Sequence, residues 1–171
     1  MDPIARINHK APALTLIDLD GHPCGLEQAD SGLLILNFWS AECQWSERAD
    51  AILANLQGEW GEGVTIWSIA PNANEARDQI TVAAEERQLR VFLDQDHATA
   101  DRYGAVTTPH FYLLDEERTI RYSGALDDTT FRQKEPTRHY LADAVQALRV
   151  GRLPEPQETN GYGCAIVRFD L

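Results

Sequence analysis

Basic residues are scarce in this sequence, which has 15 Lys and Arg against 27 Asp and Glu and a formal net charge of −12. A nucleic-acid surface needs clustered Lys and Arg to neutralise phosphates, so we expect no nucleic-acid partner. Long apolar segments are also missing, because runs such as Leu33–Leu36 are far shorter than the about 20 residues that cross a bilayer. We therefore expect no membrane partner. Residues 1–6 do not join a basic patch to an apolar segment, which predicts no secretory signal and a cytoplasmic location.

Cysteine is rare too, and the three cysteines, Cys24, Cys43 and Cys164, lie far apart. This spacing favours neither a disulfide framework nor a zinc site. The five histidines are scattered without ligand spacing, so we expect no metal and no cofactor. An isolated cysteine in a reducing compartment usually packs as a small apolar residue, unless its surroundings activate the thiol.

The chain has 171 residues, the length of one domain, which we assign to residues 1–171 with a C-terminal tail at 151–171. Apolar runs predict strands at 14–19, 23–26, 33–39, 64–70, 91–93, 110–114 and 119–123. Helical spacing predicts helices at 43–57, 74–87, 98–103 and from Pro136 onwards, with Gly58–Gly63 ending the first and Asn74 capping the second. The tail is rich in Pro, Glu and Gly, which predicts an irregular, mobile segment until the apolar stretch Cys164–Phe169.

The order of these elements predicts an α/β fold. A strand, helix, strand, helix and strand, followed by a hairpin and a helix, build a mixed central β-sheet flanked by helices. Right-handed crossovers place helices on both faces. Residues 14–26 turn at Asp20-Gly21 and add an N-terminal β-hairpin extension. This order of elements is that of the thioredoxin fold.

Cys43 lies between a buried strand and the first turn of an amphipathic helix. Free backbone N–H groups and the positive end of the helix dipole stabilise a thiolate at such a junction. Because the thiolate is the nucleophilic form, the position of Cys43 makes it the best reactive candidate. The alternative is that Cys43 only packs in the core.

Several segments resemble a known family. Residues 37–46, Asn-Phe-Trp-Ser-Ala-Glu-Cys-Gln-Trp-Ser, resemble the active-site segment of bacterial thioredoxin-like oxidoreductases, where Phe-Trp precedes a Cys-x-x-Cys pair. Residues 104–109 resemble the loop that carries the cis-proline of the fold. The opening at 11–21 is similar to redoxins of the alkyl hydroperoxide reductase/thiol-specific antioxidant superfamily. The segments 136–139 and 163–166 resemble a subgroup of redoxin-domain proteins with a similar Gly-Cys ending.

The resemblance implies a thiol-dependent redox protein with a thiol or disulfide substrate and an external thiol reductant. Ser46 replaces the second cysteine of the motif, which leaves a single active-site cysteine in a Cys-x-x-Ser motif. A serine hydroxyl cannot resolve a mixed disulfide. Ser46 either donates a hydrogen bond to the Cys43 thiolate, lowering its pKa, or is an ordinary first-turn residue.

The resemblance also implies where a substrate would lie. A cis peptide bond before Pro109 would bring the backbone of Thr108 beside Cys43, where it can bind an extended segment by strand-like hydrogen bonds. Trp39 and Trp45 bracket the active-site turn and are candidate substrate contacts. The spacing of Trp45 also fits a core residue.

Cys164 is a candidate resolving cysteine, because Gly161 and Gly163 flank it in the tail. It would attack an oxidised Cys43 within one chain or across a homodimer. The alternative is packing of Cys164 on the sheet edge with Ile166 and Phe169. Cys24 is expected to be structural.

Two other functions remain open at this point. One is a non-catalytic binding module that keeps the groove at Thr108-Pro109. The other is a weak peroxiredoxin-like peroxidase. Ser40 fits the peroxidatic motif, but Leu36 and Pro109 stand where peroxiredoxins have a proline and a peroxide-orienting arginine. Without that arginine the transition state loses charge-assisted hydrogen bonds.

Overall fold

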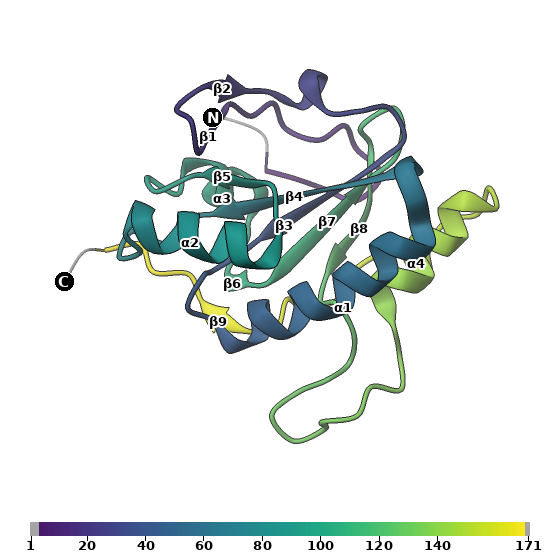
Figure 1. Cartoon of the computed structure of the whole chain (residues 1–171). Coiled ribbons are helices and arrows are strands. Elements are labelled where there is room, and N and C mark those ends of the chain that lie inside the picture. The colour runs from purple at the N-terminus through teal and green to yellow at the C-terminus, as the bar shows by residue number, and fades with distance from the viewer. Residues whose placement is uncertain (1–3, 170–171) are drawn as a thin grey trace.

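A computed structural model describes residues 4–169 and is built around a seven-stranded mixed sheet (Figure 1). The strands are β1 (Leu16–Asp18), β2 (Pro23–Cys24), β3 (Leu33–Phe38), β4 (Val64–Ala70), β5 (Val91–Leu93), β7 (His110–Leu114) and β8 (Ile120–Gly124), in the order β2-β1-β5-β4-β3-β7-β8. A separate pair joins β6 (Thr107–Thr108) to β9 (Cys164–Ala165). The predicted strands are thus present, with small shifts at their ends.

The centre of the sheet consists of parallel strands. β3 pairs with β4, which pairs with β5. All six residues of β3 are buried, because helices or other chain segments cover both sides of a parallel sheet. β7 runs antiparallel to β3 and turns into β8, and the β1–β2 hairpin extends the other edge by pairing β1 with β5.

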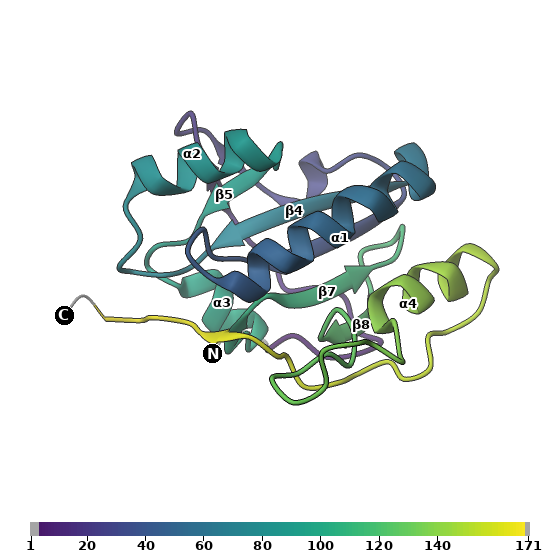
Figure 2. The same ribbon diagram turned by 60° about the horizontal axis from the view of Figure 1, so that its bottom comes forward.

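Helices cover both faces of the sheet, as Figure 2 shows. The α-helices are α1 (Gln44–Trp60), α2 (Arg77–Arg87), α3 (Ala98–Tyr103) and α4 (Tyr140–Arg149), and two 3-10 turns span Leu26–Gln28 and Gly61–Gly63. α1, α2 and α4 lie on one face, while α3 and the N-terminal segment lie on the other. This arrangement is the expected α/β thioredoxin fold. Within residues 4–169 no helix is long and apolar enough to cross a membrane.

Alternation along the strands divides the core between the two faces. Leu34, Leu36 and Phe38 of β3 pack with Trp67 and Tyr112 on the face that carries α3. The neighbouring residues of β3 point to the other face, toward α1 and α4. That cluster includes Leu33, Ile35, Ala49, Leu53, Leu141 and Val145.

The end of α1 and the start of α2 differ from the sequence expectation. α1 continues through Gly58 and ends only at Gly61, where φ is 69°. A single glycine is tolerated inside a helix, whereas a positive φ ends it. Asn74 does not cap α2, which begins at Arg77 after Ala76. There the side chain of Gln79 accepts the backbone N–H of Ala76 at 3.1 Å.

The last helix begins later than Pro136, at Tyr140. The carboxylate of Asp128 accepts the backbone N–H groups of Thr137 and Arg138 at 2.8 and 3.1 Å. These bonds hold the two residues in the loop before α4, so Pro136 and Thr137 do not open the helix.

The C-terminal tail is irregular except for β9, but it is tied to the sheet. The backbone N–H of Ser123 donates to Gln157, and that of Thr159 donates back to Ser123, at 3.0 and 2.9 Å. Further along, Ile166 donates to Val106 at 3.1 Å. In Figure 2 the tail, drawn in yellow-green, passes along the β8 side and then across the end of the sheet near α1. The tail expected to be mobile is therefore docked in this structure.

Candidate active site

Cys43 is positioned by the end of β3 and the beginning of α1. It is the N-cap residue of α1 and only 4% exposed. The backbone N–H groups of the first helical turn, which have no partner within the helix, face the N-terminal end. Together with the helix dipole they would stabilise a thiolate of Cys43 in the reduced protein.

Cys43 is joined to Cys164 by a disulfide, with their Cα atoms 6.2 Å apart. The sequence separation is 121 residues, so the bond connects the start of α1 to the C-terminal tail. The Cys-x-x-Ser motif therefore does not hold the only cysteine near Cys43, because the tail places the sulfur of Cys164 beside it. Sequence reasoning identified both cysteines and left their pairing as one of two alternatives.

The residues around Cys164 pack as a strand rather than as a loose tail. Thr108 is opposite Cys164 in the β6–β9 pair, and Thr107 is opposite Ala165. The carbonyl oxygen of Thr108 lies 3.2 Å from the Cys43 sulfur, and the Thr108–Pro109 peptide bond is cis. The edge expected to bind a substrate segment is thus occupied by the chain's own tail.

Ser46 is buried beneath the active-site turn. Its hydroxyl oxygen accepts the backbone N–H of Ser40 at 3.2 Å. Through this bond Ser46 helps to hold the active-site turn. A hydrogen bond from Ser46 to a Cys43 thiolate remains a prediction.

Glu75 also holds the turn, and sequence reasoning missed it. The carboxylate is 2% exposed, and its Oε1 accepts the Ser40 hydroxyl at 2.6 Å and the Glu42 N–H at 3.2 Å. Burial raises the pKa of Glu75, and the Ser40 hydroxyl opposes that rise. The only signal in the sequence is the position of Glu75 just after β4, the strand beside β3.

Trp39 is fully buried, which corrects the expectation that it forms part of a substrate surface. Its indole N–H donates to Asp50 at 2.8 Å, and Arg87 donates to the same carboxylate oxygen at 3.0 Å. Burial raises the pKa of Asp50, partly offset by these two donors. Trp39 therefore supports the active-site turn from below.

Trp45 lies at the surface beside the tail. Its ring meets that of Tyr162 edge to face, with centroids 5.0 Å apart. The Tyr162 hydroxyl accepts the backbone N–H of Phe131 at 2.7 Å. Trp45 and Phe131 also line a groove of 440 Å³ between α1 and the loop that follows β8. Of the two tryptophans, Trp45 is thus the one that lines a groove, and a substrate contact at Trp45 stays a prediction.

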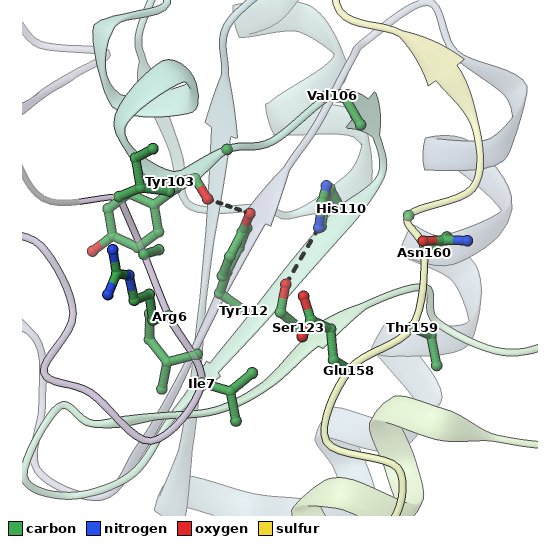
Figure 3. A pocket seen from close by; sticks show the side chains of 15 residues that line it. Arg6, Ile7, Tyr103, Val106, His110, Tyr112, Ser123, Glu158, Thr159 and Asn160 are labelled. Atoms are coloured by element: carbon green, nitrogen blue, oxygen red, sulfur yellow. Dashed lines mark hydrogen bonds between the residues drawn. The ribbon is translucent and has the colours of Figure 1, made fainter.

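A separate cavity of 540 Å³ lies on the other face of β7, between the N-terminal segment and the tail (Figure 3). His110 and Tyr112 line it from β7, and Glu158 lines it from the tail. His110 is 7% exposed, its Nε2 is 3.4 Å from the Ser123 hydroxyl, and burial lowers its pKa to about 4. Neutral His110 thus forms part of the surface beneath the docked tail.

The remaining candidates are structural. Cys24 is buried, and burial raises the pKa of its thiol, which fits the expected packing role. Within residues 4–169, one group of potential metal ligands is present, formed by Asp18, Asp20 and His22 on the first hairpin. Asp18 there accepts the backbone N–H groups of Asp20 and His22 at 2.9 and 2.8 Å, a local arrangement that stabilises the turn.

Comparison with known proteins agrees with this geometry. The model of the AhpC/TSA family matches residues 7–123. The thioredoxin-like protein YneN of Bacillus subtilis is 25% identical over 115 residues, which cover 66% of this chain and 67% of YneN.

Solved structures extend the likeness to the tail. The crystal structure of a hypothetical protein from Sinorhizobium meliloti has a TM-score of 0.85 at 25% identity, covering 99% of this chain and 97% of that one. The thioredoxin domain of a thiol-disulfide oxidoreductase from Bacteroides vulgatus has a TM-score of 0.61 at 23% identity, covering 75% of this chain and 92% of that domain. The second likeness shows the shared fold.

Proposed function

The chain belongs to the AhpC/TSA family, and from this membership we propose that it is a thiol-disulfide redox protein in which Cys43 attacks and Cys164 resolves. The observation that carries the proposal is the disulfide between these two residues. It joins a sulfur at a helix N-terminus, where a thiolate is stabilised, to a sulfur on the C-terminal tail, which would have to leave for a substrate to reach Cys43.

In the reducing direction the reaction begins with both cysteines reduced. The Cys43 thiolate attacks one sulfur of a substrate disulfide, forming a mixed disulfide, and the other substrate sulfur leaves as a thiolate that takes up a proton. The Cys164 thiolate then attacks the Cys43 sulfur. This step forms the Cys43–Cys164 bond and releases the second substrate thiol, so two electrons pass from the protein to the substrate.

Ser46 has no part in the exchange of electrons. The Cys-x-x-Ser motif supplies the attacking sulfur, and Cys164 supplies the one that the motif lacks. Because both cysteines belong to one chain, resolution needs no homodimer. Two equivalents of an external thiol, which a reducing cytoplasm would provide, return the protein to its reduced form. The first attacks the Cys43–Cys164 disulfide and forms a mixed disulfide, and the second attacks that bond, which restores both protein thiols and releases the external disulfide.

Other parts of the site support this chemistry by position. The turn that carries Cys43 is held by Glu75 through Ser40 and Glu42, and Trp39 fixes it from below. The carbonyl of Thr108 faces the sulfur from the neighbouring strand. A rigid surround of this kind keeps the reacting sulfur in place while the tail moves.

The test is the reduction of insulin disulfides with dithiothreitol as the external reductant. We expect activity in the wild type, none in Cys43→Ser, a strong loss in Cys164→Ser, and no change in the control Cys24→Ser. A non-catalytic binding module predicts no activity in any variant. A peroxidase predicts that hydrogen peroxide, rather than insulin, oxidises the reduced protein rapidly.

A further inference from the structure

The docked tail lies as an extended substrate would lie. β9 pairs antiparallel with β6, with Cys164 opposite Thr108, and the N–H of Ile166 continues the pairing by donating to Val106. Proteins commonly bind extended peptides by adding them as a strand to an exposed edge. The reactive residue of this internal peptide, Cys164, is already bonded to Cys43.

An aromatic residue secures the tail two positions before its cysteine. Tyr162 packs edge to face on Trp45 and accepts a hydrogen bond from Phe131. Both partners belong to the body of the protein, on α1 and on the loop after β8. Neither partner is part of the tail, and Phe131 is 79% exposed even with the tail docked.

The position directly before the cysteine has no room for a side chain. A β-carbon on Gly163 would lie 2.1 Å from the carbonyl oxygen of Thr108 and 3.0 Å from Cδ of Pro109. The first of these atoms is backbone, so it cannot turn aside as a flexible side chain would. The groove therefore favours glycine immediately before the reactive cysteine.

We infer that the tail is a built-in copy of the substrate, and that the site selects protein segments with the pattern aromatic–Gly–Cys. This inference rests on the proposed function and gives it a substrate class. The substrate cysteine would enter as one half of a disulfide. Cys43 attacks it, and the partner sulfur leaves as a thiol after taking up a proton.

The tail and such a substrate cannot be docked together, since both need Thr108, Trp45 and the Phe131 N–H. The reduced chain must release its tail before substrate binds. When Cys164 returns to attack the mixed disulfide, residues 161–165 take back the same contacts. Redocking of the tail thus expels the substrate thiol.

The experiment uses the full chain with Cys164→Ser, so that Cys43 is the thiol available at the site. The probe is a heptapeptide with the sequence of residues 160–166, Asn-Gly-Tyr-Gly-Cys-Ala-Ile, whose cysteine is joined by a disulfide to thionitrobenzoate. Release of the coloured thiol reports the formation of a mixed disulfide with Cys43, which mass spectrometry then confirms. Two matched peptides carry alanine in place of the tyrosine or of the glycine before the cysteine.

We expect each alanine peptide to react about tenfold more slowly than the parent. The peptide without tyrosine loses an aromatic contact with Trp45, and the peptide without glycine brings a β-carbon against the Thr108 carbonyl. Trp45→Ala in the same chain should reduce the preference for tyrosine to what the Phe131 N–H contributes and keep the preference for glycine. Tyr162→Ala in the same chain weakens the competing tail and should speed the parent peptide.

Rates that agree within twofold for the three peptides would overturn the inference while leaving the proposed function intact. A lack of reaction with all of them would overturn both.

Discussion

Cys43 at the start of α1 is covalently joined to Cys164, which lies opposite Thr108 on the strand pair β6–β9. The bond spans 121 positions of sequence and ties the C-terminal tail to the end of the sheet. A cross-link between such distant positions restricts the unfolded chain.

Reduction of this bond should lower the free energy of unfolding by about 2–5 kcal/mol, the range for disulfides that close long loops. The measurement is urea denaturation with and without dithiothreitol. Cys164→Ser is the control, since its stability should not respond to the reductant. An unchanged wild-type midpoint would show that the disulfide adds nothing to stability.

Gly163→Ala should shift the thiol–disulfide equilibrium of Cys43 and Cys164 toward the reduced form by about tenfold or more. The introduced β-carbon would overlap the carbonyl oxygen of Thr108, and overpacking of this kind costs about 1–3 kcal/mol. The equilibrium is measured against a glutathione redox buffer. The control is Gly58→Ala in α1, where a β-carbon meets nothing within 4 Å; it should leave the equilibrium unchanged. Equal behaviour of the two variants would contradict the packing argument.

Ser46→Cys should replace the function of the tail cysteine. In a chain that also carries Cys164→Ser, the introduced thiol lies on the first turn of α1 and can resolve the mixed disulfide at Cys43. We expect insulin reduction to rise at least tenfold over Cys164→Ser alone. Ser46→Ala in the same background is the matched control and should give no gain. If both double variants stay inactive, resolution is not what Cys164 contributes.

Stability should fall as the pH drops from about 6.5 to about 4 through His110. Burial lowers the pKa of His110 from 6.5 to about 4, so in this window the unfolded chain binds a proton that the folded chain does not. The difference amounts to about 3 kcal/mol over the full window. The comparison is between denaturation curves of the wild type and His110→Gln at several pH values.

Asp94 has the opposite effect on stability as the pH falls, because burial raises its pKa to about 6. This effect is the same in the wild type and in His110→Gln, so it cancels in the difference between their stabilities. If the two proteins lose stability in parallel as the pH falls, His110 does not titrate as described.

The sequence predicted the sheet well, because buried parallel strands appear as continuous apolar runs. β3 and β4 lie where Leu33–Trp39 and Val64–Ala70 indicated, and β5 and α3 have the expected bounds. Helix starts were less predictable. The loop before α4 is held by Asp128, a residue eight or more positions away from the boundary it determines, and local patterns do not contain such contacts.

The site was predictable where its residues belong to local motifs, and not where distant contacts determine their roles. Cys43, Thr108 and Pro109 belong to short motifs, so sequence alone brought them together. The roles of Glu75 and Tyr162 arise from contacts with residues 33 and 117 positions away. Trp39 and Trp45 look alike in sequence, and only the packing shows that one is buried and the other faces the tail.

The most direct test of the central claim is a single-turnover reaction between the reduced protein and a disulfide-linked peptide, quenched with acid and mapped by mass spectrometry. We predict that the wild type ends with the Cys43–Cys164 disulfide and two released substrate thiols per chain. Cys164→Ser should stop at a mixed disulfide on Cys43 with one thiol released. A wild type that keeps both cysteines reduced, or carries the substrate on Cys164 instead, would contradict the account.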